Sequence, residues 1–223
     1  MVLSQNTIEI LKNFAAINPN LLFKQGSTVD TVSDAKTMMG SANIAEVMPQ
    51  EFGIYDLNEF LSILTLVDQP QLEFGKTSVT IRDGNTSIEY RYAALDTLTV
   101  PTRKVSMPAP EVVLNLTSDS MNRLKKAASV LGHSSIQLEG KNGKISANIV
   151  NPKDKSSNKY TIVVDEKNAC TKVFSLIIPI SHLKMMTGDY VVSFSSKLIS
   201  HFKNTSIPVE YWIALEKEST FGS

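Results

Sequence analysis

Hydrophobic and polar positions along the chain follow the same order of patterns twice. Apolar residues recur every three or four positions between residues 3 and 17 and again between residues 117 and 131, which is typical of amphipathic helices. A shorter helical pattern follows in each half, at roughly 56–66 and at 179–186, and strand-like alternation surrounds these helices. The pattern predicts a duplicated unit of the α+β class, with strand-rich antiparallel sheets and few helices.

Capping residues and a proline delimit the predicted helices. Ser4 and Ser118 are each placed to cap a helix, because a serine hydroxyl can accept a hydrogen bond from a free amide of the first turn. Pro19 ends the first helix, since proline disfavours helical geometry in the residue before it.

Turn signals divide the strand regions. Asp83-Gly84-Asn85 predicts one hairpin and Asn142-Gly143 another, because these residue types suit tight hairpin turns. Earlier in the chain, Gly26 and Gly40 are expected to break residues 20–50 into short strands. The remaining expected strands are 159–165 and 172–178, interpreted as a pair, and 189–195, 198–203 and 208–215.

A connector separates the two halves. Residues 96–110 contain three prolines and little periodicity, which is typical of an extended segment between domains. We therefore expect a first domain of residues 1–108, which includes the connector, and a second domain of residues 109–223.

Composition is typical of a globular protein and argues against disulfide-bonded, secreted and membrane-spanning classes. Hydrophobic residues make up 42% of the 223 positions, and 22 basic residues balance 22 acidic ones. The single Cys170 excludes a disulfide within the chain. No signal peptide and no apolar run of about 20 residues is visible. The chain is expected to be soluble and cytosolic, with no membrane partner.

No pattern in the sequence predicts catalysis. Gly75-Lys76-Thr77 resembles the end of a phosphate-binding loop, but Pro70 occupies the position of the first glycine and a hairpin follows. The histidines and the cysteine lack the spacing of a metal site. We expect no enzymatic activity, no metal and no cofactor. The histidines are His133, His182 and His201.

One helix face carries an excess of basic residues. In the helix at 118–131, three bases accompany the single acid Asp119, and they lie opposite or beside the apolar stripe. Such a face can be a solvated surface that complements the helix dipole, or it can meet phosphates without reading bases. The polar positions are Asn122, Arg123, Lys125, Lys126 and Ser129.

The duplicated layout favours the second interpretation. Lys12 and Asn13 occupy the polar face of the equivalent first helix, and Lys184 lies in the short second helix of the later half. If equivalent helices share one surface, these residues form a lining that contacts duplex DNA through phosphates, independently of its sequence.

Several segments resemble the sliding clamps of T-even-type bacteriophages, the processivity factors of their DNA polymerases. The matching segments follow the family order along the whole chain, and the length fits one subunit. They are Leu11-Lys12-Asn13-Phe14-Ala15 with Ile17-Asn18, Ile54-Tyr55-Asp56-Leu57-Asn58 with Phe60-Leu61 and Ile63-Leu64, Lys184-Met185 with Gly188 and Tyr190, and Ala214-Leu215-Glu216 with Ser219-Thr220.

The resemblance implies a homotrimeric ring of subunits that each have two similar clamp domains, with helices lining the hole and sheets forming the outer wall. Such a ring encircles duplex DNA, is loaded by an ATP-driven clamp loader and tethers the DNA polymerase. It can also serve late transcription factors. The resemblance implies no enzymatic activity and no cofactor, and it places the protein in the cytoplasm of an infected host cell.

The resemblance also implies where subunits and partners meet. The strand at 86–92 would pair with the strand at 158–164 of the next subunit. A partner-peptide pocket would include Val105 and Met107, although a connector also uses such residues to pack on its own protein. The residues expected at the subunit joint are Tyr90, Tyr92, Tyr160 and Ile162.

A second hypothesis also explains the absence of catalytic residues. A duplicated-domain structural or interaction protein of a virus would bind only proteins and would not tether anything to DNA.

Overall fold

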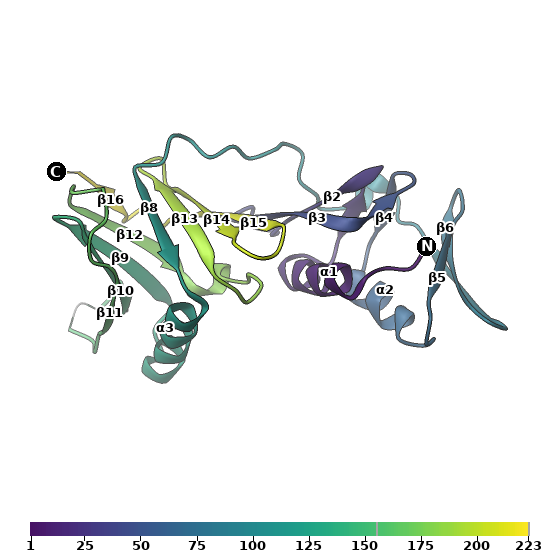
Figure 1. Ribbon diagram of the computed structural model, residues 1–223, viewed down its shortest axis with the longest axis horizontal. Coiled ribbons are helices and arrows are strands. Elements are labelled where there is room, and N and C mark those ends of the chain that lie inside the picture. The colour runs from purple at the N-terminus through teal and green to yellow at the C-terminus, as the bar shows by residue number, and fades with distance from the viewer. Residues whose placement is uncertain (155, 223) are drawn as a thin grey trace. The chain divides into compact units, whose positions relative to one another are not determined.

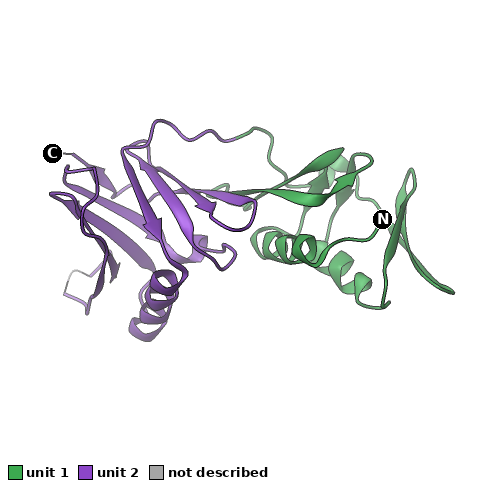
Figure 2. Ribbon diagram, viewed as in Figure 1, with its two compact units in different colours: residues 1–104 green, residues 105–223 purple. Residues whose placement is uncertain are grey.

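The computed structural model describes residues 1–154 and 156–222. The chain divides into two compact units, residues 1–104 and residues 105–223 (Figure 2). Each unit contains helices and antiparallel sheets (Figure 1), so the α+β class is confirmed.

The first unit combines two helices with two antiparallel sheets. Its strands pair in the orders β4-β1-β2-β3 and β5-β6-β7. The elements are α1 (Gln5–Ile17), β1 (Leu21–Phe23), β2 (Gly26–Val32), β3 (Met38–Met48), β4 (Phe52–Ile54), α2 (Leu57–Leu64), β5 (Gln71–Phe74), β6 (Ser78–Asp83), β7 (Thr86–Arg91) and the 3₁₀ helix η1 (Leu95–Thr97).

The second unit has one α-helix over a larger set of strands. These pair in the orders β15-β14-β13-β8 and β11-β10-β9-β12-β16. The elements are β8 (Val112–Leu116), α3 (Ser118–Leu131), β9 (Ser135–Lys141), β10 (Lys144–Val150), β11 (Tyr160–Asp165), β12 (Phe174–Pro179), the 3₁₀ helix η2 (Ile180–His182), β13 (Tyr190–Ser195), β14 (Ile199–Asn204), β15 (Val209–Ala214) and β16 (Thr220–Phe221).

The apolar stripes of α1 and α3 pack on strands. In α1, Ile10, Leu11 and Phe14 are fully buried, and the helix packs on β3 and α2. In α3, Met121 and Leu124 are buried, and the helix packs on β10 and β11. Burying each large apolar side chain contributes about 1.5–3 kcal/mol, so this packing fixes which helix face remains in solvent.

The caps agree with the sequence at one helix and differ at another. The hydroxyl of Ser4 accepts a hydrogen bond from the Thr7 amide, as predicted. At α3 the prediction of Ser118 was wrong, because Thr117 is the cap and accepts from the Ser120 amide at 3.2 Å. Ser118 already has helical geometry, since α3 begins there.

The prediction of a second helix in the later half is wrong, because this segment does not form an α-helix. Residues 179–186 contain only the three-residue η2, and Lys184 follows it in a loop. So short a segment cannot offset the cost of nucleating an isolated helix. Instead, Leu183 and Met185 are buried individually from the loop.

Two strand predictions also need correction. Gly40 does not break a strand, because β3 runs through it, and a Cβ there would lie 3.0 Å from Phe14 Cε1. The glycine therefore permits close packing of α1. Strands β11 and β12 are not partners, since β9 and β10 lie between them. The predicted hairpin at Asn142-Gly143 joins β9 to β10, and both turn residues have positive φ.

A carboxylate on β3 fixes the start of α1. Glu46 accepts hydrogen bonds from the backbone amide of Ser4 and the hydroxyl of Thr7. Burial by itself would raise the pKa of this carboxyl, but the hydrogen bonds outweigh burial and lower the pKa.

We expect Glu46→Gln to reduce the free energy of unfolding by about 1 kcal/mol at pH 7, because it weakens hydrogen bonds to a charged acceptor. The folded pKa lies below the ordinary value of 4.5, so this stabilisation is present above that pH and is lost as the pH falls through the folded pKa. Urea denaturation between pH 7 and pH 3 should show the difference between variant and parent shrinking. A difference that stays constant down to pH 3 would contradict the role of Glu46.

Candidate functional site

The polar face of α3 exposes two of the predicted bases. Asn122, Arg123 and Lys126 are exposed on the helix. The guanidinium of Arg123 lies 3.9 Å from the Asp119 carboxylate, and an exposed pair of this kind contributes little energy. Both cations can therefore meet a phosphate without losing a strong existing contact.

Lys125 lies at the edge of this face and has a different environment. Its ammonium donates a hydrogen bond of 3.0 Å to the backbone carbonyl of Leu183. The residue is half-buried, and burial lowers the pKa of the ammonium. This hydrogen bond holds α3 against the loop that carries the exposed Lys184. Lys125 therefore stabilises the position of the helix that presents the basic face.

In the first unit, the basic and acidic residues on the polar face of α1 balance each other. Lys12 is exposed and donates to Glu9 at 3.0 Å, and Asn13 beside it is half-buried. The face is polar, but one acid balances its one base. A lining shared by α1 and α3 remains a prediction.

The strands predicted at the subunit joint are the outermost strands of their sheets. Strand β7 pairs with β6, and β11 pairs with β10. An outer strand offers backbone N–H and C=O groups to another chain. Both edges can therefore accept an added strand.

Aromatic packing stiffens the β7 side. Tyr90 is 8% exposed, and its ring meets that of Phe60 edge-on at 5.3 Å between centroids. Tyr92, just beyond the strand, stacks on Phe52 at 4.9 Å. The Tyr90 hydroxyl donates a hydrogen bond of 3.3 Å to the carbonyl of Asp56, so the start of α2 lies beside β7. Burial, and after it the nearby charge of Glu59, raise the pKa of Tyr90.

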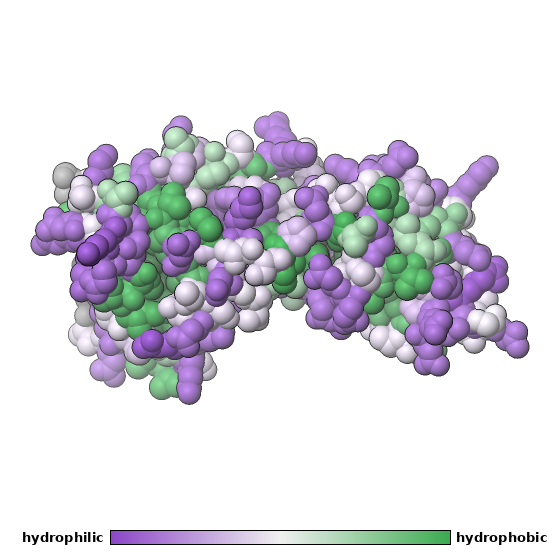
Figure 3. Space-filling view, viewed as in Figure 1, coloured by the Kyte–Doolittle hydropathy of each residue, from purple (hydrophilic) through white to green (hydrophobic). Residues whose placement is uncertain are grey.

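On the β11 side, Ile162 is buried and Tyr160 is half-buried beside α3. A hollow of about 360 Å³, here called the α3–β11 hollow, opens between the helix and the start of the strand. Figure 3 shows hydrophobic side chains at the lower end of α3 among hydrophilic ones. Arg123, Lys126 and Lys159 lie around the hollow. Its apolar lining consists of Ala127, Val130, Leu131 and Tyr160.

Sequence reasoning missed this hollow. Ala127 and Leu131 belong to the apolar positions of the helical pattern at 117–131, yet both are half-buried and line an open surface. Val130 is 77% exposed and lies outside the core stripe of the helix. An isolated valine on a polar helix face was the signal that could have revealed an interaction surface.

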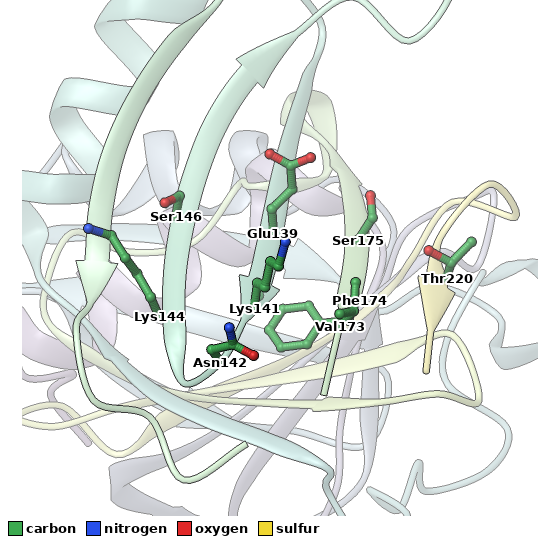
Figure 4. Close-up of a pocket in the computed structure, with 10 residues that line it drawn as sticks. Glu139, Lys141, Asn142, Lys144, Ser146, Val173, Phe174, Ser175 and Thr220 are labelled. Atoms are coloured by element: carbon green, nitrogen blue, oxygen red, sulfur yellow. The ribbon is translucent and has the colours of Figure 1, made fainter. Parts of the chain in front are cut away.

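A larger hollow of about 640 Å³ lies on the five-stranded sheet, where side chains from β9, β10, β12 and β16 surround the ring of Phe174 (Figure 4). Nearby, the buried Asn148 donates to Glu139 at 2.6 Å and accepts from Thr161 at 2.8 Å. These polar groups bind one another and thereby stabilise the sheet. Within residues 1–154 and 156–222, no group of three His, Cys, Asp or Glu residues is arranged to hold a metal ion.

The proposed partner pocket lies in an irregular segment. Val105 and Met107 occur between η1 and β8, and both are half-buried. This burial fits packing on the protein's own surface as well as a docking site, so their role stays a prediction. None of the helices in the described part of the chain is long and apolar enough to cross a membrane.

Comparisons with solved structures show the fold. The chain resembles the H. pylori beta clamp with a TM-score of 0.73 and 12% identity, over 97% of this chain and 65% of that chain. It resembles the A. fulgidus PCNA with a TM-score of 0.71 and 12% identity, over 98% and 99% of the two chains. The chain thus spans about two thirds of the bacterial clamp and nearly the whole of the archaeal protein.

Sequence comparisons extend over both units. The family described as DNA polymerase processivity factor matches residues 4–97, and the gp45 sliding clamp C-terminal family matches residues 113–217. The sliding clamp of Vibrio phage KVP40 is 33% identical, over 97% of this chain and 99% of that protein. That of Enterobacteria phage T4 is 30% identical over 99% of each. The chain therefore belongs to the sliding-clamp family of DNA polymerase processivity factors.

Proposed function

We propose that three copies of this chain close into a ring around duplex DNA and tether the replicative DNA polymerase for processive synthesis. The observation that carries this proposal is the match to phage sliding clamps over 97–99% of the chain. The two outer strands β7 and β11 supply a means of closure, because strand addition between neighbours removes exposed edges. The proposal takes residues 1–108 and 109–223 as the two clamp domains.

Contact with DNA in this ring is weak and independent of base sequence. The exposed Asn122, Arg123 and Lys126 of α3 reach phosphates, while Lys12, Asn13 and Lys184 add polar contacts. Long, mobile cations that contact only the backbone permit sliding. Retention then comes from ring closure, and the formal net charge of zero for the whole chain agrees with this division of roles.

The proposal includes partners of the ring. The ring is opened and placed on DNA by an ATP-driven clamp loader, and it also serves late transcription factors. Val105 and Met107 contribute to the docking of partner peptides. The protein itself catalyses no reaction and needs no cofactor, and it acts in the cytoplasm of an infected host cell.

Solution mass and primer extension test this proposal. At micromolar concentration the particle is expected to have three times the 24.5 kDa mass of one chain. With a cognate polymerase, clamp loader and ATP, it should lengthen the products of single binding events about tenfold or more, because a tethered polymerase rebinds from a high effective concentration. A chain that stays monomeric and leaves product length unchanged would overturn the proposal.

A further inference from the structure

The hollow around the ring of Phe174, here called the Phe174 hollow, combines exposed apolar surface with exposed bases (Figure 4). Its volume of about 640 Å³ lies within the range of roughly 300–1,000 Å³ that is typical of ligand-binding pockets. Val173 at its edge is 52% exposed. A Cβ at Gly140 would lie 2.1 Å from Phe174 Cε1, so the glycine leaves room for the ring.

Two lysines oppose each other at the hairpin end of this hollow. Lys141 of β9 and Lys144 of β10 are register partners, and both are exposed in the lining. Like charges directly opposite each other on neighbouring strands destabilise a sheet. Glu166 lies 3.4 Å from Lys144, but an exposed pair of this kind contributes little energy. A carboxylate from outside the chain would relieve the repulsion between the two lysines.

The other charges around the hollow leave this excess of positive charge in place. Glu139 is the acid in the lining, and it already pairs with Lys159 at 3.0 Å. Lys172 adds a further base, with its ammonium 5.5 Å from the centre of the Phe221 ring, which stacks on Phe174. A complementary occupant therefore needs acidic groups together with an apolar side chain.

We propose that the Phe174 hollow binds an extended peptide of a partner protein in which an apolar side chain is flanked by carboxylates. The apolar side chain packs on Val173, and the carboxylates pair with Lys141 and Lys144, since complementary charge gives specificity. A nucleic acid strand fits less well, because Phe174 is only 3% exposed and offers no open ring face on which a base could stack.

This docking site goes beyond the proposed function. Its residues all belong to the second unit and differ from the connector residues Val105 and Met107. A ring can therefore hold one partner at the Phe174 hollow and another at the connector. Because the hollow is complete within one chain, binding of the peptide does not require ring closure.

Fluorescence anisotropy of the labelled peptide Asp-Glu-Leu-Asp-Glu, titrated with the full chain, tests the proposal. Lys141→Glu is expected to weaken binding about tenfold or more, because it replaces an attraction by a repulsion. This variant keeps its fold, since position 141 is exposed and the new carboxylate faces Lys144. Val173→Asp should weaken binding by a similar factor. Lys24→Glu is the matched control, because it makes the same charge change at an exposed position of the first unit and should leave the affinity unchanged.

Two further peptides and one further variant separate the alternatives. Asn-Gln-Leu-Asn-Gln lacks the carboxylates and Asp-Glu-Ser-Asp-Glu lacks the apolar side chain, so each should bind at least about tenfold more weakly. Binding that Met107→Ala abolishes and Lys141→Glu leaves intact would place the peptide at the connector and overturn the inference.

Two other results would also overturn it. One is the absence of saturable peptide binding up to about 1 mM. The other is preferential binding of a single-stranded oligothymidylate that is lost in Lys141→Glu, which would assign the hollow to nucleic acid. A parent chain that never forms trimers would overturn the proposed ring alone, since the peptide site lies within one chain.

Discussion

Replacing both Arg123 and Lys126 with glutamine is expected to weaken the initial binding of the protein to duplex DNA by about tenfold, while the chain remains folded. Each phosphate contact contributes about 0.9 to the slope of log K against log salt concentration, so removing cations should also flatten the salt dependence. Both side chains are exposed, and the ion pair between Arg123 and Asp119 is a loose one of 3.9 Å. Titration of labelled duplex at several salt concentrations measures both effects.

The matched control removes the same charge elsewhere in the unit. Lys153→Gln with Lys167→Gln also neutralises two exposed bases, and it should leave DNA binding close to that of the parent. Equal losses in the two double variants would show that net charge matters and that the α3 face has no special role. Lys125→Gln is a third variant for comparison. Because it removes the hydrogen bond to Leu183, its main effect should be a lower melting temperature and not weaker DNA binding.

The position of Arg123 and Lys126 gives them two potential roles. Both belong to the polar face of α3 and both also border the α3–β11 hollow. Loss of DNA binding in the glutamine variant could therefore follow from a weakened ring. Solution mass separates the two causes, since a variant that stays trimeric and binds DNA poorly has lost phosphate contacts alone.

Much of the framework followed from local patterns. The three α-helices were predicted because each carries a continuous apolar stripe, and the Asn142-Gly143 hairpin was predicted because its turn requires positive φ. The prediction of a helix at 179–186 was wrong, because the apolar residues of this segment are buried individually from a loop. Their spacing imitates that of a helix. Local sequence cannot distinguish these cases, since tertiary contacts decide between them.

The candidate site was less accessible to sequence reasoning. The basic excess on α3 was visible, but periodicity could not show that Lys125 points to the Leu183 carbonyl. The α3–β11 hollow also depends on Tyr160, which lies 30 residues beyond Val130 and reaches α3 through the pairing of β10 with β11. Nonlocal pairing of this kind is set by the whole sheet.

Cutting a circular duplex after loading should release the protein, with a residence time at least about 100-fold shorter than on the intact circle. A closed ring cannot leave a circle without opening, whereas on a linear molecule it slides off an end, so only the intact circle keeps it at a high effective concentration on the DNA. The measurement is retention on nicked circular DNA during gel filtration, before and after a single restriction cut.

The control is a linear duplex whose two ends carry bulky protein blocks, which should restore retention. High salt should shorten residence on the circle only slightly, because phosphate contacts are screened while the topological link persists. A protein held by binding alone would show the reverse pattern, with retention sensitive to salt and indifferent to DNA ends. That result would favour a structural or interaction protein over a ring. It would also mean that strands β7 and β11 do not close a ring that supports processive synthesis.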